Sequence, residues 1–482
     1  MTIIVKLLSC KVSLEAELRK KNLGYYQMVK INKGLDIPLS GSPEQIIYSG
    51  KPIQSIAIIG DDYIGMKPTM AVKVGDKVKA GQILFSDKKT EGVHFTSPVS
   101  GIVEAINRGE RRVLQSLVIK LQGNDKENFK QYDAKDIPKL NRSDVIDNLV
   151  KSGLWTSLRT RPYSKVPSPN SDSPSSIFVT AVDTNPLAAS PELIISERKE
   201  DFENGLSALK HLTDGPLHLC ISGNSDLFED SNTCATLHKF TGPHPSGLVG
   251  THIHFIDPVS AKKTVWTIGY QDVLAIGALF TSGNIDPQRV ISLCGPQTLK
   301  PRLIRTLIGA NINDLIPDEL REGENRVISG SILSGRIASA SYLNGVFSYL
   351  GRYHTQITTI LEGYQREFLR YISPGSNRHS ALPIYLSSMS QTNDKKFHFT
   401  TNTNGSERAM VPVGNYEKVM PLDVLPTQLL RALIVGDTEI AQKLGCLELE
   451  EEDLALCSYV CVGKYEYGPI LRNNLSRIEK EG

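Results

Sequence analysis

The pattern of apolar and polar positions changes along the chain. Between residues 56 and 121, short apolar runs alternate with turn residues, which predicts small sheets joined by tight turns. Farther along, apolar runs of strand length alternate with segments of helical spacing, which predicts crossover units around a largely parallel sheet. Strands of this second part are predicted at 177–182, 217–222, 251–256 and 290–294, and its helices at 203–212 and 271–281.

The last third of the chain has a different character. From about residue 303 it returns to short strand-like runs, at 326–332 and 353–361. Helical patterns follow at 426–435 and 439–444. We interpret the acidic run 448–453 as the solvated start of a helix, where the macrodipole favours acidic side chains.

Taken together, these patterns predict a multidomain α/β protein. Residues 11–27 are charged without a strand pattern, so residues 1–27 are either an extension or precede a true start at Met28. We expect a β domain over 28–125, a Rossmann-like α/β domain over 126–300 with an exposed Ser- and Pro-rich loop at 165–176, a small β domain over 301–375, and a mostly helical region over 376–482.

Charge and cysteine content narrow the possible partners. Lys and Arg number 54 and Asp and Glu 52, so the net charge of +2 gives no field that would favour nucleic acid or an anionic bilayer. The most apolar window, 265–280, is broken by Gln271 and Asp272 and is predicted to be a buried helix rather than a membrane span. We therefore expect membrane contact through partners only. Seven scattered cysteines fit reduced thiols in the cytoplasm.

Two runs of the β domain resemble the barrel-sandwich hybrid of biotinyl and lipoyl domains. They are VGDKVKAGQIL at 74–84 and SPVSGIV at 97–103. A lipoyl domain carries its prosthetic group on a hairpin lysine, and Lys88 and Lys89 lie in about that place. Two adjacent lysines more often form a solvated turn, so a lipoyl-like carrier is an alternative rather than the main interpretation.

The motifs of nucleotide and cluster binding are incomplete. A dinucleotide site needs glycines after the first strand, because the backbone must approach a pyrophosphate closely, but this chain has DTNPL at 183–187. Gly330 to Gly335 resembles a phosphate loop, yet Arg336 and Ile337 follow where Lys and Ser or Thr are required. Cys457 and Cys461 have the wrong spacing for an iron–sulfur cluster, and we interpret them as packed apolar residues.

The densest group of chemically capable residues lies at 241–255, with the sequence TGPHPSGLVGTHIHF. On the predicted strand His252 and His254 would share one face, a geometry that can hold a metal, with His244 or His238 as a third ligand. Such histidines more often hydrogen-bond neighbouring loops. The glycines and prolines predict a shaped loop whose backbone can approach a ligand or partner closely. No recognisable catalytic motif occurs elsewhere.

Several longer runs along the chain are specific enough to compare with known families. They are KGLDIP at 33–38, RTRPYSKVP at 159–167, DTNPL at 183–187, GPHPSG at 242–247, THIHF at 251–255 and GKYEYGP at 463–469. Together they resemble the A subunit of the Na⁺-translocating NADH:quinone reductases, from Met28 to the carboxyl terminus. In one place the chain departs from the family pattern, because Val462 stands where a proline is expected after Cys461.

The resemblance implies a peripheral protein on the cytoplasmic side of the bacterial inner membrane. It implies a six-subunit respiratory complex that oxidises NADH, reduces ubiquinone and exports Na⁺. In that family, the A subunit docks on the membrane-embedded B subunit, has been linked to ubiquinone binding and holds no redox group, whereas FAD, FMN, riboflavin and iron–sulfur centres belong to the five partner subunits. It also implies that residues 301–375 form a β-grasp module of the SLBB type.

The resemblance therefore predicts a chain with no catalytic, cofactor-binding or metal-binding residues of its own. Besides the lipoyl-like carrier, a redox protein that binds NADH or flavin and transfers hydride is the alternative. We expect the quinone-binding or interface residues in the shaped loop, at His244, Ser246, Gly247, Gly250, His252 and His254.

Overall fold

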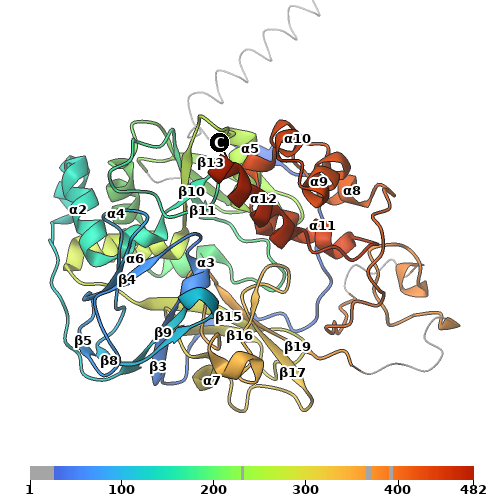
Figure 1. Cartoon of the computed structure of the whole chain (residues 1–482), viewed down its shortest axis with the longest axis horizontal. Helices are drawn as coiled ribbons and strands as arrows, with labels where there is room; N and C mark the ends of the chain where they lie inside the picture. Colours follow the sequence, from blue (N-terminus) through green and yellow to red (C-terminus); the bar gives the residue numbers. More distant parts are fainter. Residues whose placement is uncertain (1–26, 229–232, 365–371, 390–394, 482) are drawn as a thin grey trace, which may run out of the picture.

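The structure is a computed structural model that describes residues 27–228, 233–364, 372–389 and 395–481. The predictions for residues 1–26 lie outside this part. Figure 1 shows a β-rich part, a central α/β part, a second mixed sheet and a cluster of carboxyl-terminal helices packed around one another. Among the described residues, none of the helices combines the length and the apolar character that crossing a membrane requires.

The central part is built on a six-stranded sheet with the order β1-β13-β12-β11-β14-β10, in which β10 alone runs antiparallel to its neighbour. β11 pairs with β12 on one side and with β14 on the other. The strands are β1 (Gln27–Lys30), β10 (Arg159–Arg161), β11 (Ile177–Ala181), β12 (Leu217–Ser222), β13 (Thr236–Thr241) and β14 (Val265–Gly269).

Helices cover both faces of this sheet, as a parallel sheet requires. Neighbouring residues of β11 point to opposite faces of the sheet. Val179 packs in the core with α4 and α6, whereas Phe178 packs in a second core with Ile253 of α5. The predicted helices at 203–212 and 271–281 are confirmed as α4 and α6. The helices of this part are α2 (Arg142–Ser152), α3 (Pro191–Ser196), α4 (Lys199–Lys210), α5 (Val249–Ile256) and α6 (Tyr270–Ser282).

One strand prediction for this part is wrong, and another strand belongs to a different sheet from the one expected. Residues 251–256 form helix α5 instead of a strand, because a short apolar run fits a buried helix as well as a strand. Residues 290–294 are a strand, β15 (Gln288–Cys294), but it belongs to a different sheet. The Ser- and Pro-rich segment 165–176 has no helix or strand, yet it is only partly exposed, because Pro167 and Pro174 are buried.

The β-rich part consists of a four-stranded sheet, β3-β9-β8-β5, and a three-stranded sheet, β4-β6-β7. Small sheets joined by tight turns were predicted here and are confirmed. Phe85 and Phe95 stack within the core, with ring centroids 4.5 Å apart, and Lys88 and Lys89 are exposed on the turn between β6 and β7. The strands are β3 (Ser55–Ile59), β4 (Pro68–Met70), β5 (Lys77–Val78), β6 (Ile83–Asp87), β7 (His94–Thr96), β8 (Gly101–Arg108) and β9 (Leu114–Leu121).

The second mixed sheet has the order β18-β17-β19-β15-β16-β2 and carries the short helix α7 (Ile312–Leu315). Its edge strand β2 comes from near the start of the chain and pairs with β16, while β1 lies in the α/β sheet. Strand pairing therefore ties the amino-terminal segment to both sheets. The remaining strands are β2 (Glu44–Ser49), β16 (Arg302–Leu307), β17 (Asn325–Ser329), β18 (Arg336–Ile337) and β19 (Gln356–Leu361).

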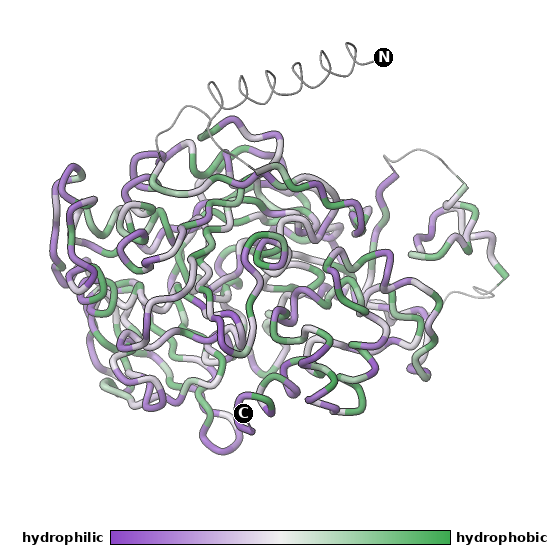
Figure 2. Tube along the Cα trace, turned by 90° about the horizontal axis from the view of Figure 1, so that it is seen from above, coloured by the Kyte–Doolittle hydropathy of each residue, from purple (hydrophilic) through white to green (hydrophobic). Residues whose placement is uncertain are grey.

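The carboxyl-terminal helices form a core of their own with Leu39 from the amino-terminal part. Helices predicted at 426–435 and 439–444 are confirmed as α9 and α10, and Cys457 and Cys461 are buried, as expected of packed apolar residues. The described residues 372–389, between β19 and α8, lie away from the main body, as Figures 1 and 2 show. The helices are α8 (Asn415–Val419), α9 (Pro426–Val435), α10 (Thr438–Lys443), α11 (Ala455–Val460) and α12 (Tyr467–Glu481).

Candidate functional site

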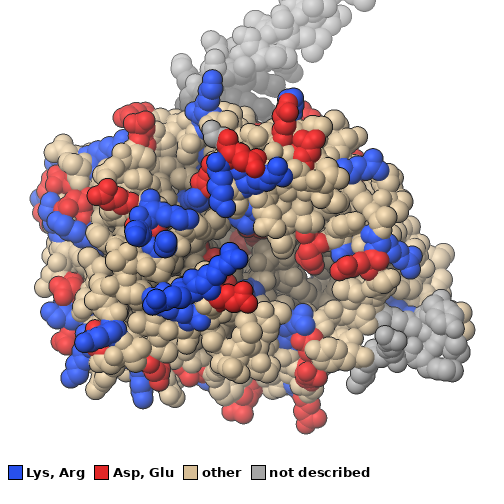
Figure 3. All heavy atoms as spheres, in the orientation of Figure 1, with Lys and Arg blue, Asp and Glu red and all other residues tan. Residues whose placement is uncertain are grey.

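A cavity of about 460 Å³ lies where the α/β sheet, the second mixed sheet and the carboxyl-terminal helices meet. The face drawn in Figure 3 is hollowed near its middle, and both basic and acidic side chains stand around the hollow. The walls come from the residues after β11, the starts of α5 and α6, the segment around residue 354 and the acidic turn at 450–452.

The order of the parallel strands explains why a cavity forms here. After β11 the chain continues to β12 on one side, while β14, which the chain reaches only after β13, lies on the other side of β11, so the strand order reverses between β11 and β14. Ligands of open parallel sheets bind in such a crevice, outside the carboxyl ends of the strands. Val182 and Asp183, which follow β11, line the cavity. Gly269, the last residue of β14, and Tyr270, the first residue of α6, line it as well.

Ion pairs hold the inner wall of the cavity. Asp272 of α6 lies between Arg289 and Arg352, and its carboxylate is 2.9 Å from the Arg352 guanidinium. Asp62 accepts hydrogen bonds from the Arg336 guanidinium, at 2.6 Å, and from the backbone N–H of Arg352, at 2.7 Å. The acidic residue that interrupts the apolar window 265–280 is thus a partner of two buried arginines.

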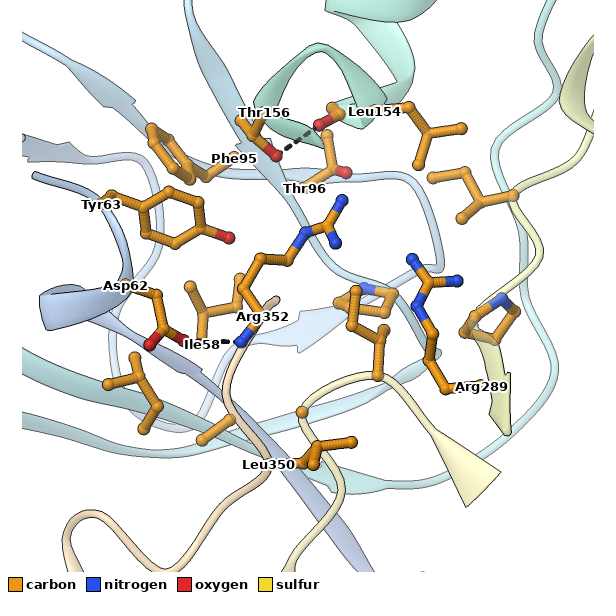
Figure 4. Close-up of a pocket in the computed structure, with 18 of the residues that line it drawn as sticks. Ile58, Asp62, Tyr63, Phe95, Thr96, Leu154, Thr156, Arg289, Leu350 and Arg352 are labelled. Atoms are coloured by element: carbon orange, nitrogen blue, oxygen red, sulfur yellow. Dashed lines mark hydrogen bonds between the residues drawn. The ribbon is translucent and has the colours of Figure 1, made fainter. Parts of the chain in front are cut away.

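A second cavity of about 60 Å³ adjoins the first and shares Asp62, Arg289 and Arg352 with it. Figure 4 shows the Arg352 guanidinium between the ring of Tyr63 and the side chain of Arg289. The ring of Phe95 packs edge-on against Tyr63, with centroids 4.6 Å apart. Arg289 and Arg352 therefore line both cavities, and the smaller one also has aromatic and aliphatic walls.

The interpretation of the acidic run as a solvated helix start is wrong. Glu450 and Asp453 are only 5% and 8% exposed, because Arg161 of β10 reaches into the turn. Its guanidinium lies 2.9 Å from Glu450 and 3.1 Å from Asp453. Burial alone would raise the pKa of Glu450, but Arg159 and Arg161 outweigh it and hold that pKa at about 2.

Glu452 lines the cavity, and its surroundings raise its pKa, whereas those of Glu450 lower it. Its carboxylate accepts a hydrogen bond from the Asn185 amide at 3.1 Å, and it has no ion pair among the described residues. Burial, reinforced by the negative charge of Glu450, raises the pKa of Glu452 to about 7. This side chain exchanges a proton near neutral pH.

We expect Glu452→Gln to remove a pH-dependent loss of stability. Because the pKa of Glu452 is higher in the folded chain than in the unfolded chain, the folded state holds its proton more tightly. The resulting stabilisation is present below the unfolded pKa and is lost as pH rises through about 7. Wild type and variant should therefore be equally stable at about pH 4, and the variant more stable by about 3 kcal/mol at about pH 8. Urea unfolding of both proteins across this range measures the difference, and parallel curves would contradict the expectation.

His354, which no motif of the sequence indicated, also lines the cavity. Its Nδ1 lies 2.8 Å from the Ser329 hydroxyl, which also accepts the N–H of Gly351 at 2.9 Å. Gly330 and Gly351 flank the ring so closely that a Cβ on either would crowd it. Burial lowers the pKa of His354 to about 4, so its imidazole is neutral at neutral pH and can serve as a hydrogen-bond donor or acceptor.

The histidines chosen from the sequence each hydrogen-bond a different part of the fold. His252 and His254 lie on a helix, where residues two apart point about 200° away from each other. His244 and His252 are 1% and 0% exposed, and burial lowers their pKa values to about 4 and about 3. They hydrogen-bond Thr184 and the backbone of Ser246, respectively, whereas His254 bonds Glu448 at 2.7 Å. Among the described residues, no group of three or more His, Cys, Asp or Glu is arranged to hold a metal.

Ser246, Gly247 and Gly250, the small residues of the same loop, differ in whether they reach the cavity. Ser246 donates its hydroxyl to the carbonyl of Gly242, and Gly247 donates its N–H to the Thr184 hydroxyl. Gly247 is the single member of the six candidates that lines the cavity. Gly250 touches the acidic turn, since a Cβ there would lie 2.3 Å from a carboxylate oxygen of Asp453. The loop therefore borders the cavity, but its side chains mainly hold the parts together.

Known proteins match this architecture along its length. Three family models match in succession: the NqrA N-terminal barrel-sandwich hybrid domain at residues 29–122, the NqrA second alpha/beta domain at 140–285, and the NQRA C-terminal domain at 290–340. The A subunit of the Na(+)-translocating NADH-quinone reductase of Hahella chejuensis is 60% identical over 457 residues, which are 94% of this chain and 100% of that protein. The chain belongs to the NqrA family.

Other relatives agree with this assignment. The proteins of the same name from Pseudomonas aeruginosa and Haemophilus influenzae are 58% and 56% identical, and each match covers 94% of this chain and 100% of the relative. The predicted NqrA resemblance and the barrel-sandwich hybrid are confirmed, and the matches do not favour a lipoyl-like carrier or a hydride-transferring redox protein. An NAD+-reducing [NiFe]-hydrogenase in the air-oxidized state covers 50% of this chain and 52% of its own, with 11% identity and a TM-score of 0.35, which supports no inference about function.

Proposed function

We propose that this chain acts as the NqrA component of a Na⁺-translocating NADH:quinone reductase and that its junction cavity receives the quinone headgroup. In this proposal it lies on the cytoplasmic side of the membrane and docks on the membrane-embedded B subunit. It holds no redox group of its own, whereas partner subunits carry the flavins and iron–sulfur centres. The NqrA relatives, which match over their full length, support the assignment to the complex.

The cavity lies outside the carboxyl ends of the parallel strands, where open α/β sheets bind nucleotides, but it is not suited to a dinucleotide. The turn after β11 contains Asp183, Asn185 and Pro186 and no glycine, so its backbone cannot approach a pyrophosphate closely. Glu452 is bonded to Asn185 at that turn. The cavity walls contain seven acidic residues and four arginines, and this excess of carboxylates disfavours phosphates.

A quinone headgroup is neutral and needs a partly apolar slot with one or two polar groups near its carbonyl oxygens. The volume of about 460 Å³ falls within the usual range of ligand cavities. Ile64, Val182 and Leu248 supply apolar wall, and His354 and Gln356 supply polar groups at the start of β19. The presence of this cavity at the sheet's switch point is the observation on which the proposal rests.

We expect Gly269→Leu to weaken quinone binding by at least tenfold. Gly269 is exposed, lines the cavity and has no atom within 4 Å of the position of a Cβ, and its φ of −81° suits any residue. A leucine would therefore fill the cavity without disturbing the fold. Gly269→Ala, which adds one methyl group, is the matched control and should retain most of the affinity.

The measurement is titration of the purified full chain with a short-chain ubiquinone, together with NADH:quinone turnover of the assembled complex. If Gly269→Leu loses both quinone binding and quinone turnover but still oxidises NADH with an artificial acceptor, the result supports this cavity as the quinone site. Absence of quinone binding by the wild-type chain and complex, or unchanged binding in Gly269→Leu, would exclude it. A stoichiometric flavin in the purified chain would refute the cofactor-free role.

A further inference from the structure

Glu452 differs from every other carboxylate of its turn. Glu450 pairs with Arg161 at 2.9 Å, Asp453 with Arg161 at 3.1 Å, and Glu451 with Arg472 at 2.6 Å. Pairing with arginine favours the ionised form of a carboxylate. Among the described residues Glu452 has no such partner, yet it lines the cavity directly.

The groups that face Glu452 come from four elements. Its own turn contributes the carboxylates of Glu450 and Asp453, and the residues after β11 contribute Asp183 and the Asn185 amide. β10 contributes Arg159, which lies 3.5 Å from Glu450 and places its guanidinium over the ring of Tyr353. Ser334 approaches from the loop between β17 and β18, with its hydroxyl 3.5 Å from the Glu452 carboxylate.

These surroundings favour the protonated carboxyl group. Burial acts first and the nearby carboxylates of Glu450, Asp183 and Asp453 add to it, so the pKa of Glu452 is about 7. Arg159 is engaged by Glu450. A carboxyl group in this state can give a proton at neutral pH and take one back from water in the cavity.

Other polar groups of the cavity are less suited to this exchange. Asp62 and Asp272 are held by arginines. The imidazole of His354 is neutral and can only orient a ligand by hydrogen bonding near neutral pH. The pKa of Asp183 is also raised by burial, but its oxygens accept from the backbone N–H of Asn185 and, at 3.4 Å, from the Thr355 hydroxyl.

We propose that Glu452 is the proton donor to the quinone reduced in this cavity. The inference rests on the proposed function, because it requires the quinone headgroup to lie here. NADH supplies two electrons through the partner subunits, and the quinone takes up two protons to become the quinol. As one quinone oxygen gains its proton, the O–H bond of the Glu452 carboxyl group breaks and a carboxylate remains. Water entering the open cavity reprotonates Glu452 and supplies the second proton.

The test uses the assembled complex with Glu452→Gln, and with Glu439→Gln as the control for loss of an exposed carboxylate on α10. Turnover of NADH with a short-chain ubiquinone is measured from about pH 5.5 to 9, beside NADH oxidation by ferricyanide. Quinone affinity of each purified chain is measured separately.

We expect Glu452→Gln to lower quinone turnover at neutral pH by at least tenfold, a loss in the range typical of general acids. Ferricyanide reduction and quinone affinity should stay within about twofold of wild type. The wild-type decline in turnover as pH rises through the pKa of Glu452 should be absent from the variant and present in Glu439→Gln.

A variant that binds quinone normally and keeps the wild-type turnover and pH profile would overturn the assignment of Glu452. Failure of the wild-type chain and complex to bind quinone, or normal binding by Gly269→Leu, would instead overturn the proposed function. The two failures are therefore distinguishable.

Discussion

Replacing Arg161 with methionine is expected to cost about 3–5 kcal/mol of unfolding free energy, because it leaves the buried carboxylate of Asp453 without a cation and Glu450 with Arg159 alone. The Arg161 side chain is 1% exposed and contacts Glu450 and Asp453, and it also donates to the backbone carbonyl of Glu448 at 2.8 Å. These contacts join β10 of the α/β sheet to the acidic turn before α11. The carboxyl-terminal helices should therefore loosen from the α/β part before the rest unfolds.

Urea unfolding measures the cost, and limited proteolysis locates the loosened segment. Lys443→Met is the matched control, because it breaks an ion pair with Glu439 whose side chains are 69% and 79% exposed. An exposed pair of this kind contributes about 0.5 kcal/mol or less. Equal stability of the Arg161 and Lys443 variants would contradict the importance of the buried network.

Gly277→Ala is expected to destabilise the chain by about 3 kcal/mol through overpacking between α4 and α6. A Cβ on Gly277 would lie 1.8 Å from the carbonyl oxygen of Asp201 and 3.0 Å from the backbone nitrogen of Gly205. These are backbone atoms, so the helices would have to separate. The clash outweighs the gain of about 1 kcal/mol that alanine brings to a helix.

The comparison is with Gly269→Ala, at a position with open space beside the backbone. Thermal or urea unfolding should show a large loss for Gly277→Ala and little change for Gly269→Ala. Since α6 begins with Tyr270 and Asp272 in the cavity wall, Gly277→Ala should also weaken quinone binding. Equal unfolding midpoints for the two variants would show that α4 and α6 can move apart at little cost.

Local signals predicted many of the elements well. Helix α9 spans Pro426–Val435, with the predicted bounds, because proline suits its first turn and Gly436, at φ 74°, ends it. The strands β11 and β12 were found because their apolar runs are buried on both faces of a parallel sheet. In each case the residues that define the element are neighbours in the sequence.

Predictions failed where distant residues decide the outcome. The run at 290–294 is a strand, but nothing within it shows that its partners are β16 and β19 rather than β14. The run at 251–256 is apolar enough for either a strand or a short buried helix. The acidic turn was interpreted as solvated because its partner Arg161 lies 292 positions from Asp453 in the chain.

The sequence by itself determined the family, the order of its main parts and the lack of a glycine turn for a dinucleotide, because long runs of residue types record these directly. Only the tertiary structure decided which carboxylates would be ionised and which would keep a proton. A carboxyl pKa depends on burial and on the charges that folding brings beside it. Four consecutive acids at 450–453 look alike in the sequence, and folding supplies arginines to three of them and a cavity to Glu452.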